Sequence, residues 1–218
     1  KIKVMKLDLA DLGSVHDFVK SFKKDHEKLD ILLNNAGIMW CPYNETKDGF
    51  ESQMGTNHFG HFALTGLLLD LLKKTKGSRV VNVSSLGHRN GELDFNNIQF
   101  ENGGYKPTQA YYNSKLANLL FTYELQRKFE EHGLDIISVA AHPGGSATNL
   151  SRYVEKKLWF RILKPLLYIF AQSAEMGTLP EVRASVDPNV KGSEYYGPNS
   201  KREFKGYPVR VESIPASH

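Results

Sequence analysis

The sequence predicts an α/β fold built around a parallel sheet. Three short apolar runs, at residues 29–33, 80–83 and 136–141, have the composition of buried parallel strands. Stretches of helical length and periodicity separate these runs along the chain. A turn of small or hydroxyl-bearing residues follows each of them, and ligands of such sheets bind beyond the carboxyl ends of the strands. The candidate functional residues are therefore expected in those turns.

The front of the chain has the pattern of a strand, a helix and a second strand. Residues 2–9 alternate apolar and polar side chains, which predicts a strand, and residues 8–11 supply a turn and a helix cap. The following helix, expected over residues 12–26, places Val15, Phe18, Val19 and Phe22 on one face. The strand at 29–33 then completes a βαβ unit.

The turn after this unit offers candidate cofactor contacts. It reads Asn34-Asn35-Ala36-Gly37, and a glycine at a strand end lets a ligand approach the backbone. Asn35, Ala36 and Gly37 are the candidates, and a plain turn without a ligand is the alternative interpretation.

A helix-rich stretch over residues 48–74 is apolar along most of its length, so we expect it to be largely buried. Asn57 within it is either a satisfied helix side chain or a functional amide. His58 and His61 have the spacing of some metal pairs, but a third ligand is not evident nearby in the sequence, so we interpret them as structural.

Tyr111 and Lys115 are the strongest catalytic candidates. In a helix expected to run to about residue 132, they lie four apart on one face, which puts an ammonium one turn from a phenol. A fixed cation lowers the pKa of a phenol and lets it move protons. The same spacing occurs twice more, at Tyr43/Lys47 and Tyr153/Lys157, in charged, loop-like sequence.

Position in the chain distinguishes the Tyr111 pair from the other two. Only this pair follows a strand that ends in Ser84-Ser85 and precedes one that ends in the turn His142-Pro143-Gly144-Gly145. Both of those strand ends are expected at the ligand-binding edge of the sheet.

The last third of the chain is harder to interpret. Residues 151–170 are strongly apolar but interrupted by Arg161, Lys164 and Pro165, which is too broken for a transmembrane helix. A lid over an apolar site, a subunit contact and a membrane-surface helix are the three interpretations, in that order. A helix over 173–185, a short edge strand over 194–198 and a polar tail are expected to follow.

Composition favours one globular domain over residues 1–218. The chain is 40% hydrophobic and 24% charged, and its net charge of +4 comes from scattered basic residues, which does not favour nucleic-acid binding. The single cysteine, Cys41, excludes an internal disulfide framework and a Cys-based zinc site. A cytoplasmic location is expected, while a membrane anchor preceding Lys1 stays open.

Taken together, these residues resemble the short-chain dehydrogenases/reductases. The matching motifs follow in the family's order: Asn34-Asn35-Ala36-Gly37, Asn57, Ser85, Tyr111-x-x-x-Lys115 and Pro143-Gly144-x-x-x-Thr148. The sequence around these motifs looks like that of the retinol dehydrogenase and protochlorophyllide reductase branch of the family. The resemblance covers essentially the whole chain, and it implies a doubly wound, three-layer α/β/α sheet of the Rossmann type.

The resemblance also implies an NAD(P)-dependent oxidoreductase acting on an apolar alcohol or carbonyl. Tyr111 would be the general acid/base, Lys115 would lower its pKa, and Ser85 would bind the substrate oxygen, while Asn57 would hold a water. The residues implied at the cofactor are Asp8 and Leu9 at the adenine, Asn35, Ala36 and Gly37 at the adenosine ribose, Tyr111 and Lys115 at the nicotinamide ribose, and Pro143, Gly144 and Thr148 at the nicotinamide.

One departure from the family pattern concerns the front end. The family's first strand, its Gly-rich turn and its second strand do not precede Lys1, so the strand at 2–9 would lack its neighbour. We therefore expect a truncated chain that neither binds the cofactor tightly nor folds stably alone. The residues that choose between NAD and NADP would lie in the absent part, although the resemblance slightly favours NADP. A non-catalytic binding or scaffold protein is the alternative, and a homo-oligomer stays open.

Overall fold

The computed structural model describes residues 2–146, 153 and 171–217, and these residues form a five-stranded sheet in the order β1-β2-β3-β4-β5. The first four strands are parallel to their neighbours, and the fifth is antiparallel to the fourth. Their bounds are Ile31–Asn34 (β1), Ser78–Val83 (β2), Ile136–Ala141 (β3), Tyr195–Pro198 (β4) and Pro208–Val211 (β5).

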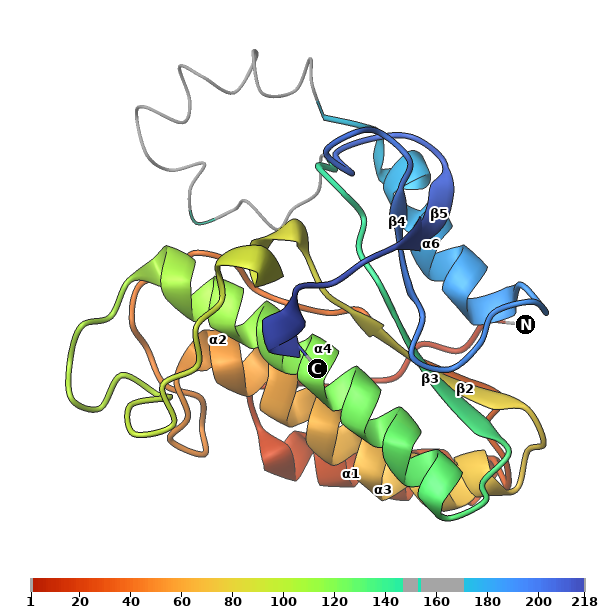
Figure 1. Ribbon diagram of the computed structural model, residues 1–218. Coiled ribbons are helices and arrows are strands. Elements are labelled where there is room, and N and C mark those ends of the chain that lie inside the picture. Colours follow the sequence, from red (N-terminus) through yellow and green to blue (C-terminus); the bar gives the residue numbers. More distant parts are fainter. Residues whose placement is uncertain (1, 147–152, 154–170, 218) are drawn as a thin grey trace.

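Helices cover both faces of this sheet (Figure 1). On one side lie α1 (Leu12–Asp25), α3 (Gly60–Lys73) and α4 (Pro107–Glu131), and on the other lies α6 (Ala174–Val186). A short helix α2 (Ser52–Met54) and a π-helical segment (Gly55–Phe59) lead directly into α3. The expected three-layer, Rossmann-like α/β fold is therefore confirmed.

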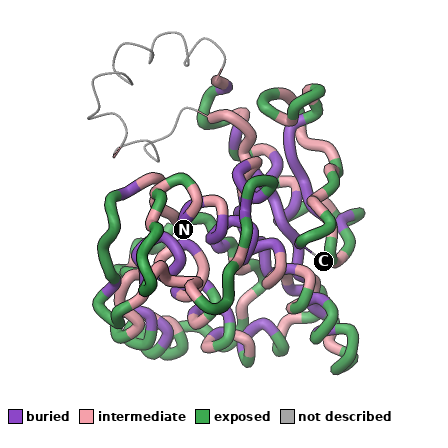
Figure 2. The backbone as a smooth tube through the Cα atoms, turned by 60° about the vertical axis from the view of Figure 1, so that its left-hand side comes forward, coloured by how far each residue is buried: buried purple, intermediate pink, exposed green. Residues whose placement is uncertain are grey.

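The core lies between these layers. Asp11 caps α1 by accepting a hydrogen bond from the Ser14 N–H, and Val15 and Val19 on the buried face of α1 belong to one apolar cluster with Leu64 of α3. The central strands β2 and β3 are buried along most of their length, and Figure 2 shows buried residues gathered in the interior with many exposed ones around the outside. This rigid centre determines where the carboxyl ends of β2 and β3 lie.

Residues 2–9 do not form the strand that their alternation predicts. They have no strand beside them in the described part of the chain, and Ile2 and Val4 are 94% and 92% exposed. Only the end of the segment is packed: a Cβ added to Gly60 would meet the Leu9 carbonyl oxygen at 2.4 Å. The alternation identified a segment that could form a strand, but a strand needs a hydrogen-bonding partner.

The strand predicted at 29–33 begins and ends slightly later than expected, and its burial was overestimated. Because β1 has β2 as its single neighbour in the described sheet, Ile31 and Leu33 remain 38% and 43% exposed. Two of the three predicted apolar runs, in β2 and β3, are buried as expected.

The prediction for the C-terminal part of the chain also needs a correction. Strand β4 is not an edge strand, because β5 pairs with it from within the supposed polar tail. Residues 151–170, apart from Tyr153, lie outside the described residues, as do the interpretations placed on them. Across the part of the chain that the structure describes, no helix is long and apolar enough to cross a membrane.

Candidate active site

Helix α4 carries Tyr111 and Lys115 one turn apart on its buried face. Pro107 begins the helix, where its missing N–H is harmless and its restricted φ suits a helix start. Each of the two side chains is 4% exposed, and the Lys115 Nζ lies 5.8 Å from the centroid of the Tyr111 ring. The other Tyr/Lys pair within the described residues, Tyr43 and Lys47, lies in a loop, as expected.

Ser85 follows β2 directly and lies beside Tyr111. It caps the short 3-10 helix Leu86–Asn90, and its Oγ accepts a hydrogen bond of 3.2 Å from the Gly87 N–H. The Ser85 side chain lies close enough to the Tyr111 phenol to lower its pKa. The hydroxyl of the adjacent Ser84 instead donates to the Lys115 carbonyl over 2.8 Å. Of the two serines, the structure thus brings Ser85 to the phenol and gives Ser84 a structural contact.

The pKa of Tyr111 differs from the sequence-based expectation. Burial raises the pKa of this phenol to about 12, and the hydrogen bond with Ser85 opposes the rise without cancelling it. Lys115 was expected to lower this pKa, but the loss of solvation is the larger effect. Tyr111 therefore keeps its proton at neutral pH, which suits donation to a carbonyl oxygen.

Lys115 is a buried ammonium held by the end of β2. Its Nζ donates to the Val83 carbonyl over 3.0 Å, and the Asn118 side chain donates to the same oxygen over 3.2 Å. Burial lowers the pKa of Lys115 to about 8, and the carboxyl group of Glu181 opposes that shift. Lys115 thus stays mainly protonated at neutral pH, with its ionisation close to the physiological range.

Asn57 lies in the π-helical segment and is fully buried. Its amide pairs with the backbone of Ile38, accepting from the N–H at 2.8 Å and donating to the carbonyl at 3.0 Å. The same amide donates to the Ser114 hydroxyl over 2.9 Å. The Asn57 side chain therefore connects the loop after Gly37 to helix α4. The backbone carbonyl of Asn57 accepts a hydrogen bond from Nδ1 of His61. π-Helical turns of this kind are frequent at functional sites.

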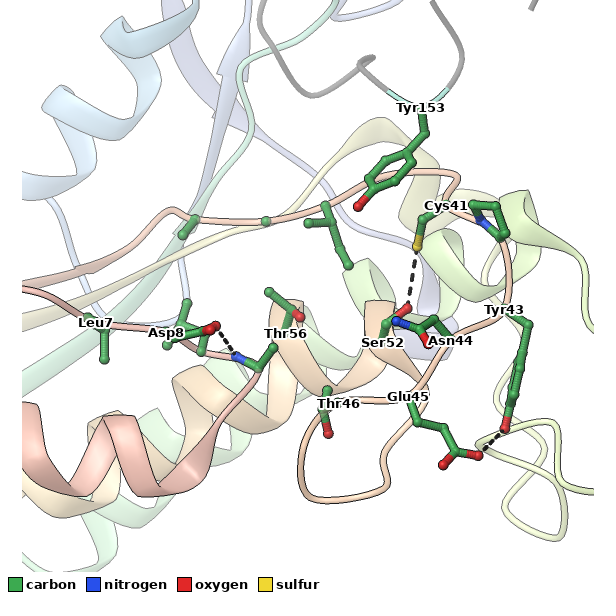
Figure 3. Close-up of a pocket in the computed structure, with 16 residues that line it drawn as sticks. Leu7, Asp8, Cys41, Tyr43, Asn44, Glu45, Thr46, Ser52, Thr56 and Tyr153 are labelled. Atoms are coloured by element: carbon green, nitrogen blue, oxygen red, sulfur yellow. Dashed lines mark hydrogen bonds between the residues drawn. The ribbon is translucent and has the colours of Figure 1, made fainter. Parts of the chain in front are cut away.

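Four of the predicted cofactor contacts line one pocket of about 660 Å³ (Figure 3). These are Asp8, Leu9, Ala36 and Gly37, and residues 41–46 and Thr56 form much of the remaining wall. The Tyr153 side chain also lines the pocket. Asn35, exposed at the end of β1, does not line this pocket.

Gly37 lies where this pocket meets the buried polar groups of Asn57 and Lys115. A Cβ at this position would meet Asn57 Oδ1 at 3.0 Å and would come within 3.8 Å of the Lys115 Nζ. The missing side chain therefore leaves a space between the pocket and the α4 lysine. The residues present fit a nicotinamide dinucleotide, because its sugar and phosphate groups need close approach to the backbone and hydrogen-bond donors.

The turn after β3 occupies the other side of the site. Gly144 has φ of +63°, and Pro143 and Gly144 are half-buried. Neither lines the pocket of Asp8 and Gly37, while Thr148 lies outside the described residues. The predicted residues thus divide into one pocket at the end of β1 and one turn at the end of β3, with Tyr111 and Lys115 on α4.

His58 and His61, which the sequence interpretation treats as structural, each have a hydrogen-bond partner within the fold. The His58 Nδ1 pairs with the Asn118 side chain at 3.2 Å, and burial lowers the pKa of His61 to about 4. The described residues contain no group of His, Cys, Asp or Glu side chains that could hold a metal ion.

Sequence reasoning missed the pairing of four titratable groups near the site, namely Arg89, His142, Glu181 and Glu203. Arg89, Glu181 and Glu203 lie in segments interpreted as a loop, a helix and a polar tail, where local pattern carries no sign of their partners. His142 belongs to a turn that the sequence does identify, but its pattern gives the ring no role.

Glu181 on α6 is a buried carboxyl group, with 5% of the residue exposed. Burial raises its pKa to about 7, and the charge of Lys115 opposes that shift. The folded protein thus retains this proton at pH values where the unfolded chain has lost it. The free energy of unfolding should therefore fall as the pH rises from the ordinary value of 4.5 to about 7.

We expect Glu181→Gln to raise the melting temperature at about pH 8 and to change it little at about pH 5. The gain in unfolding free energy has an upper limit of about 3 kcal/mol, reduced by the lost attraction to Lys115. Thermal unfolding at the two pH values measures this. Glu212→Gln, the same change at an exposed position, is the matched control. An identical effect at both pH values would contradict the burial argument.

The structure combines a doubly wound α/β sheet, a serine at the end of a strand, and a buried tyrosine and lysine on one helix. Together these features define a Rossmann-type protein with the side chains of a dehydrogenase. The family model described as short chain dehydrogenase matches residues 1–159, and the chain belongs to that family.

Named relatives support the assignment of the chain to the retinol dehydrogenase branch, which its motifs resemble. The chain is 45% identical over 177 residues to retinol dehydrogenase 11 of Mus musculus, covering 81% of this chain and 54% of that protein. It is 40% identical over 207 residues to retinol dehydrogenase 14 of Mus musculus, covering 94% of this chain and 61% of that protein. The chain thus spans somewhat more than half the length of these curated relatives.

Solved structures show the same fold. An uncharacterised protein from Mycobacterium paratuberculosis has a TM-score of 0.73 at 39% identity, covering 100% of this chain and 69% of that one. A short chain dehydrogenase from Burkholderia cenocepacia, solved in complex with NADP, has a TM-score of 0.61 at 20% identity, covering 88% of this chain and 72% of that one.

Proposed function

We propose that this chain belongs to an oxidoreductase that transfers a hydride between a nicotinamide cofactor and an apolar alcohol or carbonyl. The observation that carries the proposal is the buried Tyr111 phenol, which lies near Ser85 and has Lys115 one turn away. Membership of the short-chain dehydrogenase family and the retinol dehydrogenase relatives support the same reaction class.

In this proposal Tyr111 is the general acid/base. With its pKa raised to about 12, the phenol is protonated at neutral pH and can donate to the carbonyl oxygen during reduction. Ser85 donates a second hydrogen bond to that oxygen and stabilises the charge that develops on it. Lys115 supplies the positive charge that stabilises the tyrosinate left after donation. Asn57 positions the Ile38 loop, and a water held there would return the proton.

The nicotinamide, when bound, supplies the hydride chemistry, and the protein supplies position and charge. Asp8 and Leu9 are proposed at the adenine end because they line the same pocket as Gly37. The remaining proposed contacts are Asn35, Ala36, Tyr111, Lys115, Pro143, Gly144 and Thr148. NADP is the favoured cofactor over NAD on the family resemblance.

The proposal extends to the substrate and the assembly. The printed names of the retinol dehydrogenase relatives suggest an apolar alcohol for this chain as well. One domain over residues 1–218, a cytoplasmic location and self-association also belong to the proposal. Cell fractionation and light scattering during gel filtration would test the last two.

Cofactor titration and turnover test the function directly. The full-length protein should change NADPH or NADH fluorescence on binding and should reduce a long apolar aldehyde faster than a short polar one. Cofactor binding without turnover of any carbonyl in the panel would favour a binding protein. Absence of cofactor binding would overturn the proposal.

A further inference from the structure

The Glu203 carboxylate joins two segments that are far apart in the sequence. One of its oxygens, Oε1, accepts from the Arg89 guanidinium at 2.7 Å, and the other, Oε2, lies 3.1 Å from Nε2 of His142. Arg89 belongs to the 3-10 helix that Ser85 caps, and His142 begins the turn that contains Pro143 and Gly144. A single carboxylate therefore bridges the serine side and the cofactor side of the proposed site.

The hydrogen bonds define the protonation state of His142. The Gly144 N–H donates to Nδ1 over 3.2 Å, so Nδ1 must be the unprotonated nitrogen and Nε2 must carry the proton donated to Glu203. The His142 side chain is 0% exposed. Burial lowers the pKa of His142, although Glu203 opposes the shift, so the ring is neutral. Neutral His142 thus links the Gly144 backbone to the Glu203 carboxylate.

The carboxylate remains charged in this position. Burial alone would raise the pKa of Glu203, but the hydrogen bonds from His142 and Arg89 outweigh burial and lower it. Charge-assisted hydrogen bonds of this kind are stronger than neutral ones. The backbone of Glu203 has φ of 52°, a left-handed value that a non-glycine residue rarely adopts unless its surroundings hold it there.

The loop around Glu203 packs directly on the turn. The Gly145 N–H donates to the Phe204 carbonyl over 2.7 Å, and a Cβ at Gly144 would meet the same oxygen at 2.5 Å. On the far side, a Cβ at Gly197 would meet His142 Nε2 at 2.0 Å. The two backbones and the imidazole leave no space for even one methyl group, so movement of Glu203 must be transmitted to the turn.

The other end of the bridge reaches Ser85. The His88 Nδ1 donates to the Ser85 carbonyl over 2.6 Å, and Arg89 is the next residue of the same short helix. Tyr195 packs between the rings of His88 and His142, with centroid distances of 5.5 Å and 5.2 Å. The serine and the Gly144 turn are thus parts of one hydrogen-bonded and packed unit.

We propose that Glu203 is a positioning residue that keeps the Gly144 turn and the Ser85 helix at a set separation. The turn would then face the nicotinamide while Ser85 and Tyr111 face the reacting oxygen. This inference rests on the proposed function for its consequence, but the bridge itself is testable without a cofactor.

The first test uses cofactor affinity. Glu203→Ala should weaken nicotinamide dinucleotide binding about 10-fold, because the Gly144 turn would lose the contact that positions it against the cofactor. Glu203→Gln should lose less, because its amide oxygen can still accept from one of the two donors. Arg202→Ala, at the exposed neighbouring position, is the control and should leave affinity unchanged. Unaltered affinity in folded Glu203→Ala would overturn the inference.

The second test detects the hydrogen bond between His142 and Glu203 in the protein without cofactor. Nitrogen-15 NMR of the His142 ring should show a proton on Nε2 and none on Nδ1, and Glu203→Ala should change this signal while Arg202→Ala does not. A doubly protonated ring or an Nδ1-protonated tautomer in the unaltered protein would refute the bridge. If the unaltered protein shows the expected tautomer but binds no nicotinamide cofactor, the proposed function fails and the bridge stands.

Discussion

Tyr111→Phe should abolish most of the turnover while leaving the protein folded. The substitution keeps the buried ring and removes only the hydroxyl group, which lies near Ser85. Proton transfer by a positioned side chain contributes about 100-fold to 10,000-fold, so the rate constant should fall by that order. Steady-state turnover of an apolar aldehyde, together with cofactor titration, measures the loss at full cofactor occupancy.

Tyr112→Phe is the matched control for this experiment. It makes the same chemical change on the adjacent residue of α4, whose ring centroid lies 6.3 Å from that of Tyr111. The control should retain the turnover of the unaltered protein. If Tyr111→Phe kept a near-normal rate with the cofactor bound, the assignment of the general acid/base would be wrong.

Lys115→Met should lower turnover and stabilise the fold at the same time. Burial lowers the pKa of Lys115 from 10.5 to about 8, so the folded protein carries the full cost of a buried charge below about pH 8. That cost is relieved as pH rises from about 8 towards 10.5, because the ammonium loses its proton. Removing the group should therefore raise the melting temperature most below pH 8.

Activity should change in the opposite direction. Without the ammonium near the Tyr111 ring, the charge left on the phenol after proton donation is unbalanced in a buried site, so turnover should fall about 100-fold or more. Lys115→Arg keeps the charge and separates the electrostatic effect from the shape of the side chain. A joint loss of stability and turnover in Lys115→Met would indicate a purely structural lysine and count against the proposed mechanism.

The features that could be predicted correctly from the sequence depend on interactions between residues close together in the chain. Strand β3 has the predicted bounds, and α4 carries Tyr111 and Lys115 on one buried face as their spacing indicated. These features depend on apolar runs and helical periodicity, which are local properties of the chain. The motif order was sufficient in addition to predict the family, which the family model confirms.

Features that depend on partners far along the chain could not be predicted in this way. Residues 2–9 have a strand-like alternation but no neighbouring strand among the described residues, whereas β5 becomes a strand because β4 pairs with it. The alternation is a local property, and strand formation requires hydrogen bonds from another segment.

The chemistry of the candidate site shows the same division. The spacing of Tyr111 and Lys115 predicted a phenol next to a cation, but the direction of the Tyr111 pKa follows from burial, which packing alone determines. Likewise, Glu203 has no distinguishing pattern in the sequence, and it meets Arg89 and His142 only because β4 and β5 bring their connecting loop onto the Gly144 turn. The sequence by itself thus determined which residues could take part, and the tertiary structure decided their solvation and their partners, because both depend on segments that meet only in the folded chain.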